Sequence, residues 1–109
     1  MESKTGNVRE EATRYRLVQL SCENVTVTPE MAARWLADNP HNRAIRKERV
    51  DELCETIRSG KWKPSPPIEV FDTGRLWNGQ HRLTAIVETG CAVELRVKVL
   101  KKEENVKHN

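Results

Sequence analysis

The segment from residue 67 to residue 100 constrains the fold most, because its hydrophobic pattern changes from strand to helix and back. It opens with "PIEVF", which is typical of a strand, continues with the turn "DTG", and returns through Arg75 to Trp77 as a hairpin partner. Apolar residues at helical spacing then predict a helix that begins near Asn78 and stops at Gly90. The alternation of apolar and charged residues from Ala92 to Leu100 predicts a final strand with one solvent-exposed face.

The residues upstream of this segment predict further strands and two helices. The stretch "RYRLVQL", residues 14–20, alternates as a strand does, and "NVTVT" predicts a second short strand. Thr28-Pro29-Glu30 is a helix-start signal, because threonine caps, proline suits the first turn and an acid suits the positive end of the helix dipole. A one-sided apolar stripe places the next helix at about residues 46–59. The mixture of elements predicts an α+β fold, with a small mixed sheet and about three helices.

A chain of 109 residues is expected to form one domain. Both of its ends are polar and show no periodic pattern of apolar residues. We therefore assign residues 13–100 to the domain, with a flexible N-terminal tail at 1–12 and a polar C-terminal tail at 101–109.

The composition excludes several classes of protein. Hydrophobic residues make up 37% and charged residues 32% of the chain, which is typical of a globular domain and not of a disordered chain. No apolar run approaches the roughly 18 residues of a membrane helix, and no apolar segment marks a secretory signal. We therefore expect a cytoplasmic protein without a membrane partner. The net charge of +3 permits contact with nucleotides or nucleic acid.

The three cysteines Cys22, Cys54 and Cys91 lie far apart in the sequence. Because no CxxC spacing is present, the sequence predicts no zinc site and no other metal site. We expect all three to be reduced and to lie in or near the core as small apolar residues.

The stretch "RLWNGQHRLTAI" places an amide, an imidazole and a guanidinium at a strand-to-helix corner. The first N–H groups of a helix lack partners and lie at the positive end of its dipole, so such a corner attracts anions. Asn78 is expected to cap the helix, and Gly79 to let a ligand approach the backbone. Arg82 offers a planar fork to phosphate oxygens, and His81 a phosphate contact or a proton carrier. With Gln80 these residues form the predicted phosphate or nucleotide site, and a plain turn at a helix start is the alternative.

Two further groups extend this prediction. The polar residues Asn39, Asn42 and Arg43 precede the second predicted helix, and we expect them to form a second wall of the pocket that faces Gly79. A capped connecting loop is the alternative. Trp62, between two lysines in a proline-rich loop, either stacks on a base or covers the apolar edge of the hairpin.

The segment "PIEVFDTGRLWNGQHRLTAIVETGCAVELRVKV" resembles the core of the ParB/sulfiredoxin fold. Members of that fold carry a strand, a short turn, a G-x-[HR]-R-[LY] helix start and a strand after a glycine. Upstream, "NPHNR" and "SGKWKPSPPI" resemble the family's Asn-Pro…Arg segment and its Gly-x-x-x-Pro-Ile lead-in. The resemblance covers about Val27 to Val99, is strongest to small "GQHRL" proteins of bacteria and phages, and implies a compact ParB/sulfiredoxin-like domain.

Members of this family bind nucleoside triphosphates at the helix start. The resemblance therefore implies a nucleoside triphosphate with Mg²⁺ as ligand, and Gly79, His81 and Arg82 at the phosphate-binding positions. It also implies that Asn39 and Arg43 belong to a segment that closes over nucleotide or DNA. Gln80 stands where sulfiredoxins carry their nucleophilic cysteine, and an amide is not a nucleophile, so sulfinic-acid reduction is not expected.

Three functions agree with these features. The first is a small ParB-like module that binds a nucleotide or nucleic-acid phosphate at Gly79 to Arg82, in phage or plasmid DNA metabolism or in modulation of a host system. The second is a Mg²⁺-dependent nucleotide triphosphatase, phosphotransferase or nuclease. The third is a protein-interaction or inhibitor domain that has lost its ligand chemistry. The sequence leaves the oligomeric state open.

Overall fold

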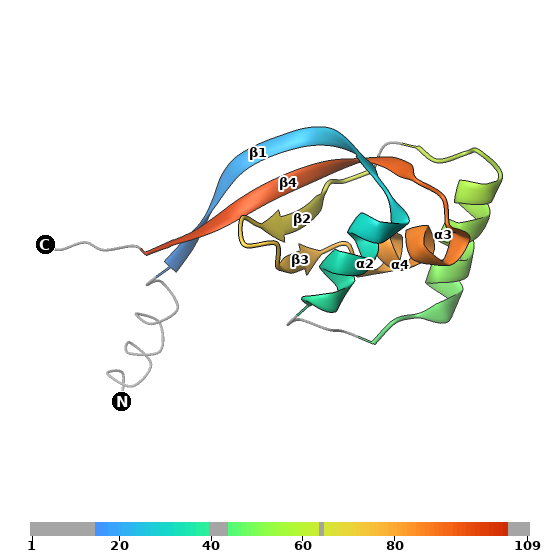
Figure 1. Ribbon diagram of the computed structural model, residues 1–109, viewed down its shortest axis with the longest axis horizontal. Coiled ribbons are helices and arrows are strands. Elements are labelled where there is room, and N and C mark those ends of the chain that lie inside the picture. Colours follow the sequence, from blue (N-terminus) through green and yellow to red (C-terminus); the bar gives the residue numbers. More distant parts are fainter. Residues whose placement is uncertain (1–14, 40–43, 64, 105–109) are drawn as a thin grey trace, which may run out of the picture.

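The computed structural model describes residues 15–39, 44–63 and 65–104, which form a mixed four-stranded sheet and three helices (Figure 1). The elements in chain order are β1 (Tyr15–Val27), α2 (Pro29–Ala37), α3 (Lys47–Arg58), β2 (Ile68–Phe71), β3 (Leu76–Asn78), α4 (Gln80–Thr89) and β4 (Val93–Glu104). The predicted α+β class, with a small mixed sheet and three helices, is thereby confirmed.

The strands lie in the order β1-β4-β2-β3. β1 and β4 pair antiparallel, from Tyr15 opposite Glu104 to Val27 opposite Val93. β2 pairs with β3 in an antiparallel hairpin and with β4 in a parallel arrangement. A parallel pair needs a crossover connection, and here β3 and α4 supply it. The corner between β3 and α4 therefore lies inside this crossover.

The pairing of β1 with β4 corrects two expectations from the sequence. The two strands expected at residues 14–20 and 24–28 are one strand, with an irregularity between Gln19 and Ser21. The polar residues 21–23 remain in the strand because they pair with β4. β4 continues to Glu104, past the domain boundary expected at residue 100, whereas the tail expected at 1–12 lies outside the described residues.

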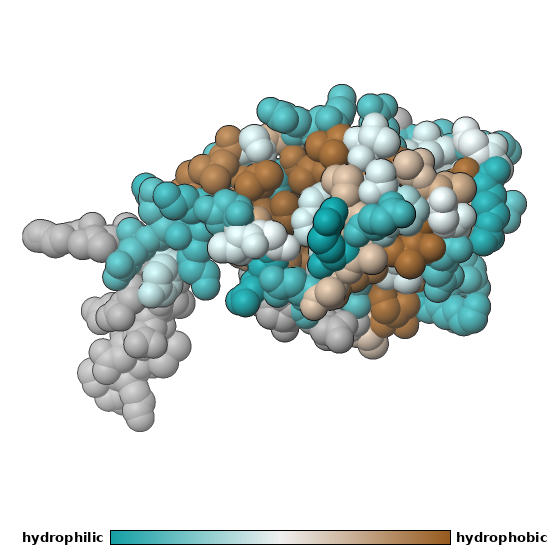
Figure 2. Space-filling model, viewed as in Figure 1, coloured by the Kyte–Doolittle hydropathy of each residue, from teal (hydrophilic) through white to brown (hydrophobic). Residues whose placement is uncertain are grey.

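The far end of the β1–β4 pair extends beyond the helices as a two-stranded ribbon (Figure 1). β1 is an edge strand, and its side chains Tyr15, Leu17 and Leu20 are exposed. Figure 2 shows hydrophobic surface gathered along this ribbon at upper left, and hydrophilic surface at the right over α3. An edge strand that combines unpaired backbone groups with apolar side chains suits contact with another chain.

The main core lies between the sheet and the helices α2 and α4 (Figure 1). Its fully or almost fully buried members come from both layers: Val27, Ala32, Ile68, Val70, Leu76, Leu83, Ile86, Val93, Leu95 and Val97. In β4 the buried residues alternate with exposed ones along the first half of the strand, as the predicted solvent-exposed face requires. Burying one such aliphatic side chain contributes roughly 1.5–3 kcal/mol, so this cluster dominates the stability of the fold.

The helix α3 packs mainly on α4, through a second buried cluster of Val50, Leu53, Cys54 and Ala85. The predicted apolar stripe is confirmed, because its residues Val50, Leu53 and Cys54 are the buried ones of α3. The helix begins and ends within one residue of the predicted bounds at 46 and 59. Ile57 of α3 also packs against the main core, so α3 is joined both to α4 and to the layer beneath it.

The start of α2 follows its sequence signal. The Thr28 hydroxyl accepts a hydrogen bond from the backbone N–H of Met31 at 3.2 Å, and Pro29 is the first helical residue. This side-chain cap confirms the predicted helix start.

The end of α2 is fastened to the hairpin. The carbonyl of Asp38 accepts a hydrogen bond from the N–H of Leu76 at 3.0 Å, and its carboxylate lies 3.4 Å from Arg75 Nε. These contacts bring Asn39, the next residue, to the end of β3 and the start of α4.

Candidate functional site

The corner between β3 and α4 differs in detail from the expectation. The helix begins at Gln80, with Gly79 in the capping position and no side-chain cap. Asn78 does not cap the helix, which corrects the prediction, because its amide donates to Glu69 Oε1 at 3.3 Å across the hairpin. Glu69 also lies 3.5 Å from Lys98 Nζ, so Asn78 belongs to a polar group on the sheet.

Gly79 serves packing at this corner. Its φ is 125°, a backbone conformation that residues other than glycine rarely adopt. A Cβ atom placed on Gly79 would lie 2.6 Å from Cγ2 of Ile68, which is fully buried. The side of Gly79 that a side chain would occupy is therefore filled by the core.

His81 connects the beginnings of two helices. Its Nε2 accepts a hydrogen bond from the backbone N–H of Arg46, the residue before α3, at 3.1 Å. A ring nitrogen that accepts this bond carries no proton. His81 thus positions α3 against α4, and proton transfer through Nε2 would require this contact to break.

Arg82 points away from the helix start toward the loop between α3 and β2. Its Nη1 donates to Ser65 Oγ at 3.1 Å and to the carbonyl of Pro66. Burial lowers the pKa of the guanidinium, and the positive charge of Arg49 lowers it further. No carboxylate lies within ion-pair distance of Arg82 among the described residues, so its charge is held without a carboxylate partner.

The structure brings most of the predicted site residues together. Asn39 lines a small hollow with residues 78–81, which agrees with its expected place facing Gly79. A second hollow at the helix start, of about 170 Å³, joins residues 78–82 to Arg49 and Leu53. Asn42 and Arg43, expected in the second wall, lie outside the described residues.

A larger hollow adjoins this corner, and Arg82 belongs to both. It has a volume of about 540 Å³, and we call it the basic groove. The residues that line it are Arg49, Leu53 and Thr56 of α3, Arg82 of α4, and Lys61, Trp62, Lys63, Ser65 and Pro66 of the loop. Four of these side chains are cationic, two carry a hydroxyl, and none of these nine residues is acidic. Such a lining suits an anionic ligand.

Sequence reasoning missed three of these groove residues: Arg49, Thr56 and Ser65. Arg49, Leu53 and Thr56 are spaced i, i+4 and i+7, so they share one stripe of α3. This spacing could have identified Arg49 and Thr56 from the sequence, because it places both on the same helix face as Leu53. Ser65 carries no local signal, because its role comes from the approach of Arg82.

Trp62 packs against the core, whereas its stacking on a base stays a prediction. It is partly buried and packs against both buried clusters. Its indole Nε1 is buried and has no hydrogen-bond partner among the described residues. The same side chain lines the basic groove and a further hollow beside β4. Trp62 therefore anchors the loop and forms part of a ligand-accessible wall.

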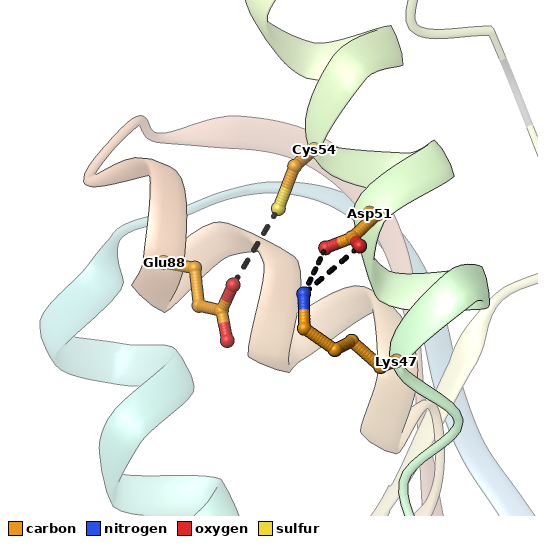
Figure 3. Close-up of polar contacts among 4 residues, drawn as sticks. All are labelled: Lys47, Asp51, Cys54 and Glu88. Carbon is orange, nitrogen blue, oxygen red and sulfur yellow. Dashed lines mark hydrogen bonds and ion pairs between the residues drawn. The ribbon is translucent and has the colours of Figure 1, made fainter.

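Cys54, next to the groove residue Leu53, is a buried thiol that we expect to react slowly. Figure 3 shows the Cys54 sulfur pointing from α3 toward Glu88 of α4, beside the ion pair of Lys47 and Asp51. Cys54 Sγ lies 4.0 Å from Glu88 Oε1 and 3.9 Å from the Ala85 carbonyl. Burial raises the pKa of the Cys54 thiol, and the charge of Glu88 raises it further. The expected core placement is confirmed for Cys54 but is wrong for Cys91, which is exposed.

Alkylation should separate these thiols. In the folded protein at pH 8, iodoacetamide should modify Cys91 first and Cys54 more than about tenfold more slowly, because a buried thiol with a raised pKa forms little thiolate. Timed quenching and peptide mass spectrometry measure both rates. In denaturant the two rates should converge, and similar rates in the native protein would contradict the burial of Cys54.

Two searches of the described residues found nothing. They contain no group of three or more His, Cys, Asp or Glu side chains placed to hold a metal ion. None of their helices is long and apolar enough to cross a membrane.

Comparisons with known proteins add no relative to this description. No family model, no curated protein and no solved structure matches this chain.

Proposed function

We propose that this chain is a small binding domain for a phosphate-bearing ligand, a nucleotide or a nucleic acid, which it holds in the basic groove. The observation that carries the proposal is the lining of that groove: four cationic side chains, two hydroxyls and a tryptophan, without an acid among the nine residues. This keeps the function expected from the sequence. It moves the centre of the site from the backbone of Gly79 to the side chains around Arg82.

Arg82 and Arg49 are the principal contacts in this proposal. Burial and the neighbouring charge of Arg49 both disfavour the Arg82 cation and lower its pKa, an effect that Glu69 only partly offsets, so an anion in the groove would stabilise it. A phosphate would accept charge-assisted hydrogen bonds from both guanidinium groups. The hydroxyl of Ser65, which accepts from Arg82, can donate its hydrogen to a further phosphate oxygen, whereas the Thr56 hydroxyl already donates to the Glu52 carbonyl.

The groove supports binding better than hydrolysis. A nucleoside triphosphate fits the donor set, because its charge matches the four cations. Mg²⁺ would have to be held by the phosphates, since none of the described lining residues offers a carboxylate. The same lining contains no acidic side chain to act as a general base, so we place the enzymatic alternatives second.

A protein-interaction role is a further candidate, favoured by one observation. The edge strand β1 exposes Tyr15, Leu17 and Leu20 along the ribbon, far from the groove. The two roles do not exclude each other, because they use different surfaces. Sedimentation of the wild-type protein and of Leu17→Glu at several concentrations would reveal self-association through this edge.

The groove is tested by replacing Arg82. We expect ATP, CTP or pyrophosphate to bind the wild type in calorimetric titration, and Arg82→Ala to weaken that binding at least about tenfold, since hydrogen bonds to charged groups contribute ~1.5–3 kcal/mol. Arg34→Ala is the matched control, because Arg34 is exposed on α2 outside the groove and its loss changes the net charge equally.

Lys63→Ala removes a second groove cation that is exposed and belongs to neither buried cluster, so it guards against a folding defect in Arg82→Ala. Circular dichroism establishes that each variant is folded. If folded Arg82→Ala and Lys63→Ala bind as the wild type does, the ligand lies elsewhere. If the wild type binds none of the three ligands and no oligonucleotide, the proposed function is wrong.

A further inference from the structure

The basic groove continues into a hollow on each of two sides. The hollow of about 170 Å³ at the start of α4 shares Arg49, Leu53 and Arg82 with the groove. A hollow of about 390 Å³ beside β4 shares Trp62 and Ser65 with it. Because they share these lining residues, the three hollows adjoin one another from the α4 corner past Trp62 to β4, and we call the row of three the track.

Cationic side chains recur along this whole track. Arg49 and Arg82 stand at its first junction, and Lys61 and Lys63 line the central groove. At the far end, Arg96 Nη2 donates to the Ser65 carbonyl at 3.3 Å, and its guanidinium lines the last hollow. A mononucleotide concentrates its charge at one end, whereas a polynucleotide repeats it with each residue. The spread of cations fits the repeated charge.

Trp62 stands where the second and third hollows meet. An aromatic wall beside a cationic groove is the arrangement by which proteins hold single strands, with bases stacked on the ring and phosphates on the cations. Beyond Trp62, the last hollow offers the amide of Asn24 and the carboxylate of Glu94. Those groups can accept from or donate to the polar edge of a base, which phosphate alone does not need.

The helix beside the track disfavours a duplex. The solvent side of α3 carries the exposed acids Glu48, Asp51, Glu52 and Glu55. Asp51 and Glu52 form ion pairs with Lys47 and Arg49, so Glu48 and Glu55 are the acids expected to repel the second strand of a duplex that lay over this side of α3. We expect a single strand in the track to meet less of this repulsion.

We propose that the track binds single-stranded nucleic acid, with successive phosphates along Arg49, Arg82 and Lys63 and a base against Trp62. This inference rests on the proposed function and names its ligand. It predicts that affinity grows with strand length, that it depends steeply on salt, and that it is lower for a duplex.

A length series tests the inference separately from the proposed function. Fluorescein-labelled oligothymidylates of about two, four and eight residues, together with dTMP as competitor, are titrated with the full chain and followed by anisotropy. We expect the eight-residue strand to bind at least about tenfold more tightly than the shortest one, and dTMP to compete weakly. If dTMP or ATP binds as tightly as the longest strand, the inference fails while the proposed function stands. If neither class binds, both fail. A matching duplex that binds as well as the strand also overturns the inference.

The salt dependence of the binding constant measures how many phosphates of the strand the protein neutralises. For a single strand, log K should fall with log salt by roughly 0.7 for each phosphate neutralised. Arg49→Gln and Lys63→Gln should each reduce that slope by about 0.7, whereas Arg34→Gln should leave it unchanged. Slopes in the two groove variants equal to the wild-type slope would exclude the track as the phosphate path.

Tryptophan fluorescence reports on stacking. The eight-residue strand should quench emission of the wild type and of Trp77→Phe, because Trp77 contacts Phe71 in the hairpin, outside the track. Trp62→Phe should lose this quenching while it still binds the strand. Quenching that survives in Trp62→Phe would show that no base stacks there and would overturn that part of the assignment.

Discussion

Replacing Gly79 with alanine is expected to destabilise the protein by about 2–6 kcal/mol, a large part of the roughly 5–15 kcal/mol that holds a domain folded. Two terms add. The φ of 125° costs a residue with a side chain about 1–3 kcal/mol. The new methyl group would also lie 2.6 Å and 2.8 Å from two side-chain atoms of Ile68, and relieving such overpacking costs typically 1–3 kcal/mol.

Gly74→Ala is the matched control for this substitution. Gly74 also has a positive φ, of 93°, but no atom lies within 4 Å of the place where its Cβ would be. It should therefore lose the conformational term alone, about 1–3 kcal/mol. Urea unfolding followed by circular dichroism measures both variants. Equal losses would mean that Ile68 yields without cost, and that Gly79 is not required by packing.

Leu83→Ala is expected to cost about 2.7–5 kcal/mol, the range for leucines deleted from a well-packed core. Leu83 is 0% exposed and stands on α4, in the cluster that joins this helix to the sheet. Removing its methyl groups leaves a cavity between layers that cannot easily collapse. The midpoint of thermal unfolding should fall by more than about 10 °C, at roughly 4–8 °C per kcal/mol for a chain of this size.

Val87 provides the comparison on the same helix. It is 39% exposed, so Val87→Ala should change the unfolding free energy by less than about 0.5 kcal/mol. Both positions lie in one helix, and alanine gains more helix propensity over valine than over leucine, so propensity adds to the expected difference in the same direction as packing. If the two losses were similar, α4 would not be packed on the sheet as described.

The helices and strands were predictable because their signals are local. The apolar stripe of α3 and the alternation of β4 lie within single segments, and each fixes which residues are buried. Thr28 and Gly90 mark helix ends through their own chemistry, since one caps with its hydroxyl and the other adopts a positive φ. Errors arose where a boundary depended on a distant partner, as in the long pairing of β1 with β4.

The candidate site was only half predictable for the same reason. The sequence placed Gly79, His81 and Arg82 at one corner, and the structure confirms that they lie there. What each side chain does depends on contacts with residues far along the chain: Gly79 meets Ile68, and His81 meets the backbone of Arg46. A motif of consecutive residues carries no information about these contacts with residues distant in the sequence. The groove itself forms only when the loop folds against α3 and Arg82.

The order of the strands has a consequence for how the chain is made. β1 is synthesised first, yet its hydrogen-bonding partner β4 is the last element, with Tyr15 opposite Glu104. The edge of β2 that pairs with β4 also lacks its partner strand until β4 has been synthesised. Translation must therefore deliver a β1 with exposed Tyr15, Leu17 and Leu20 and no partner until the end of β4 emerges. Contacts of such long sequence separation slow folding and leave the nascent chain open to aggregation. The ribbon is thus the pairing of the described fold that can form only at the end of synthesis.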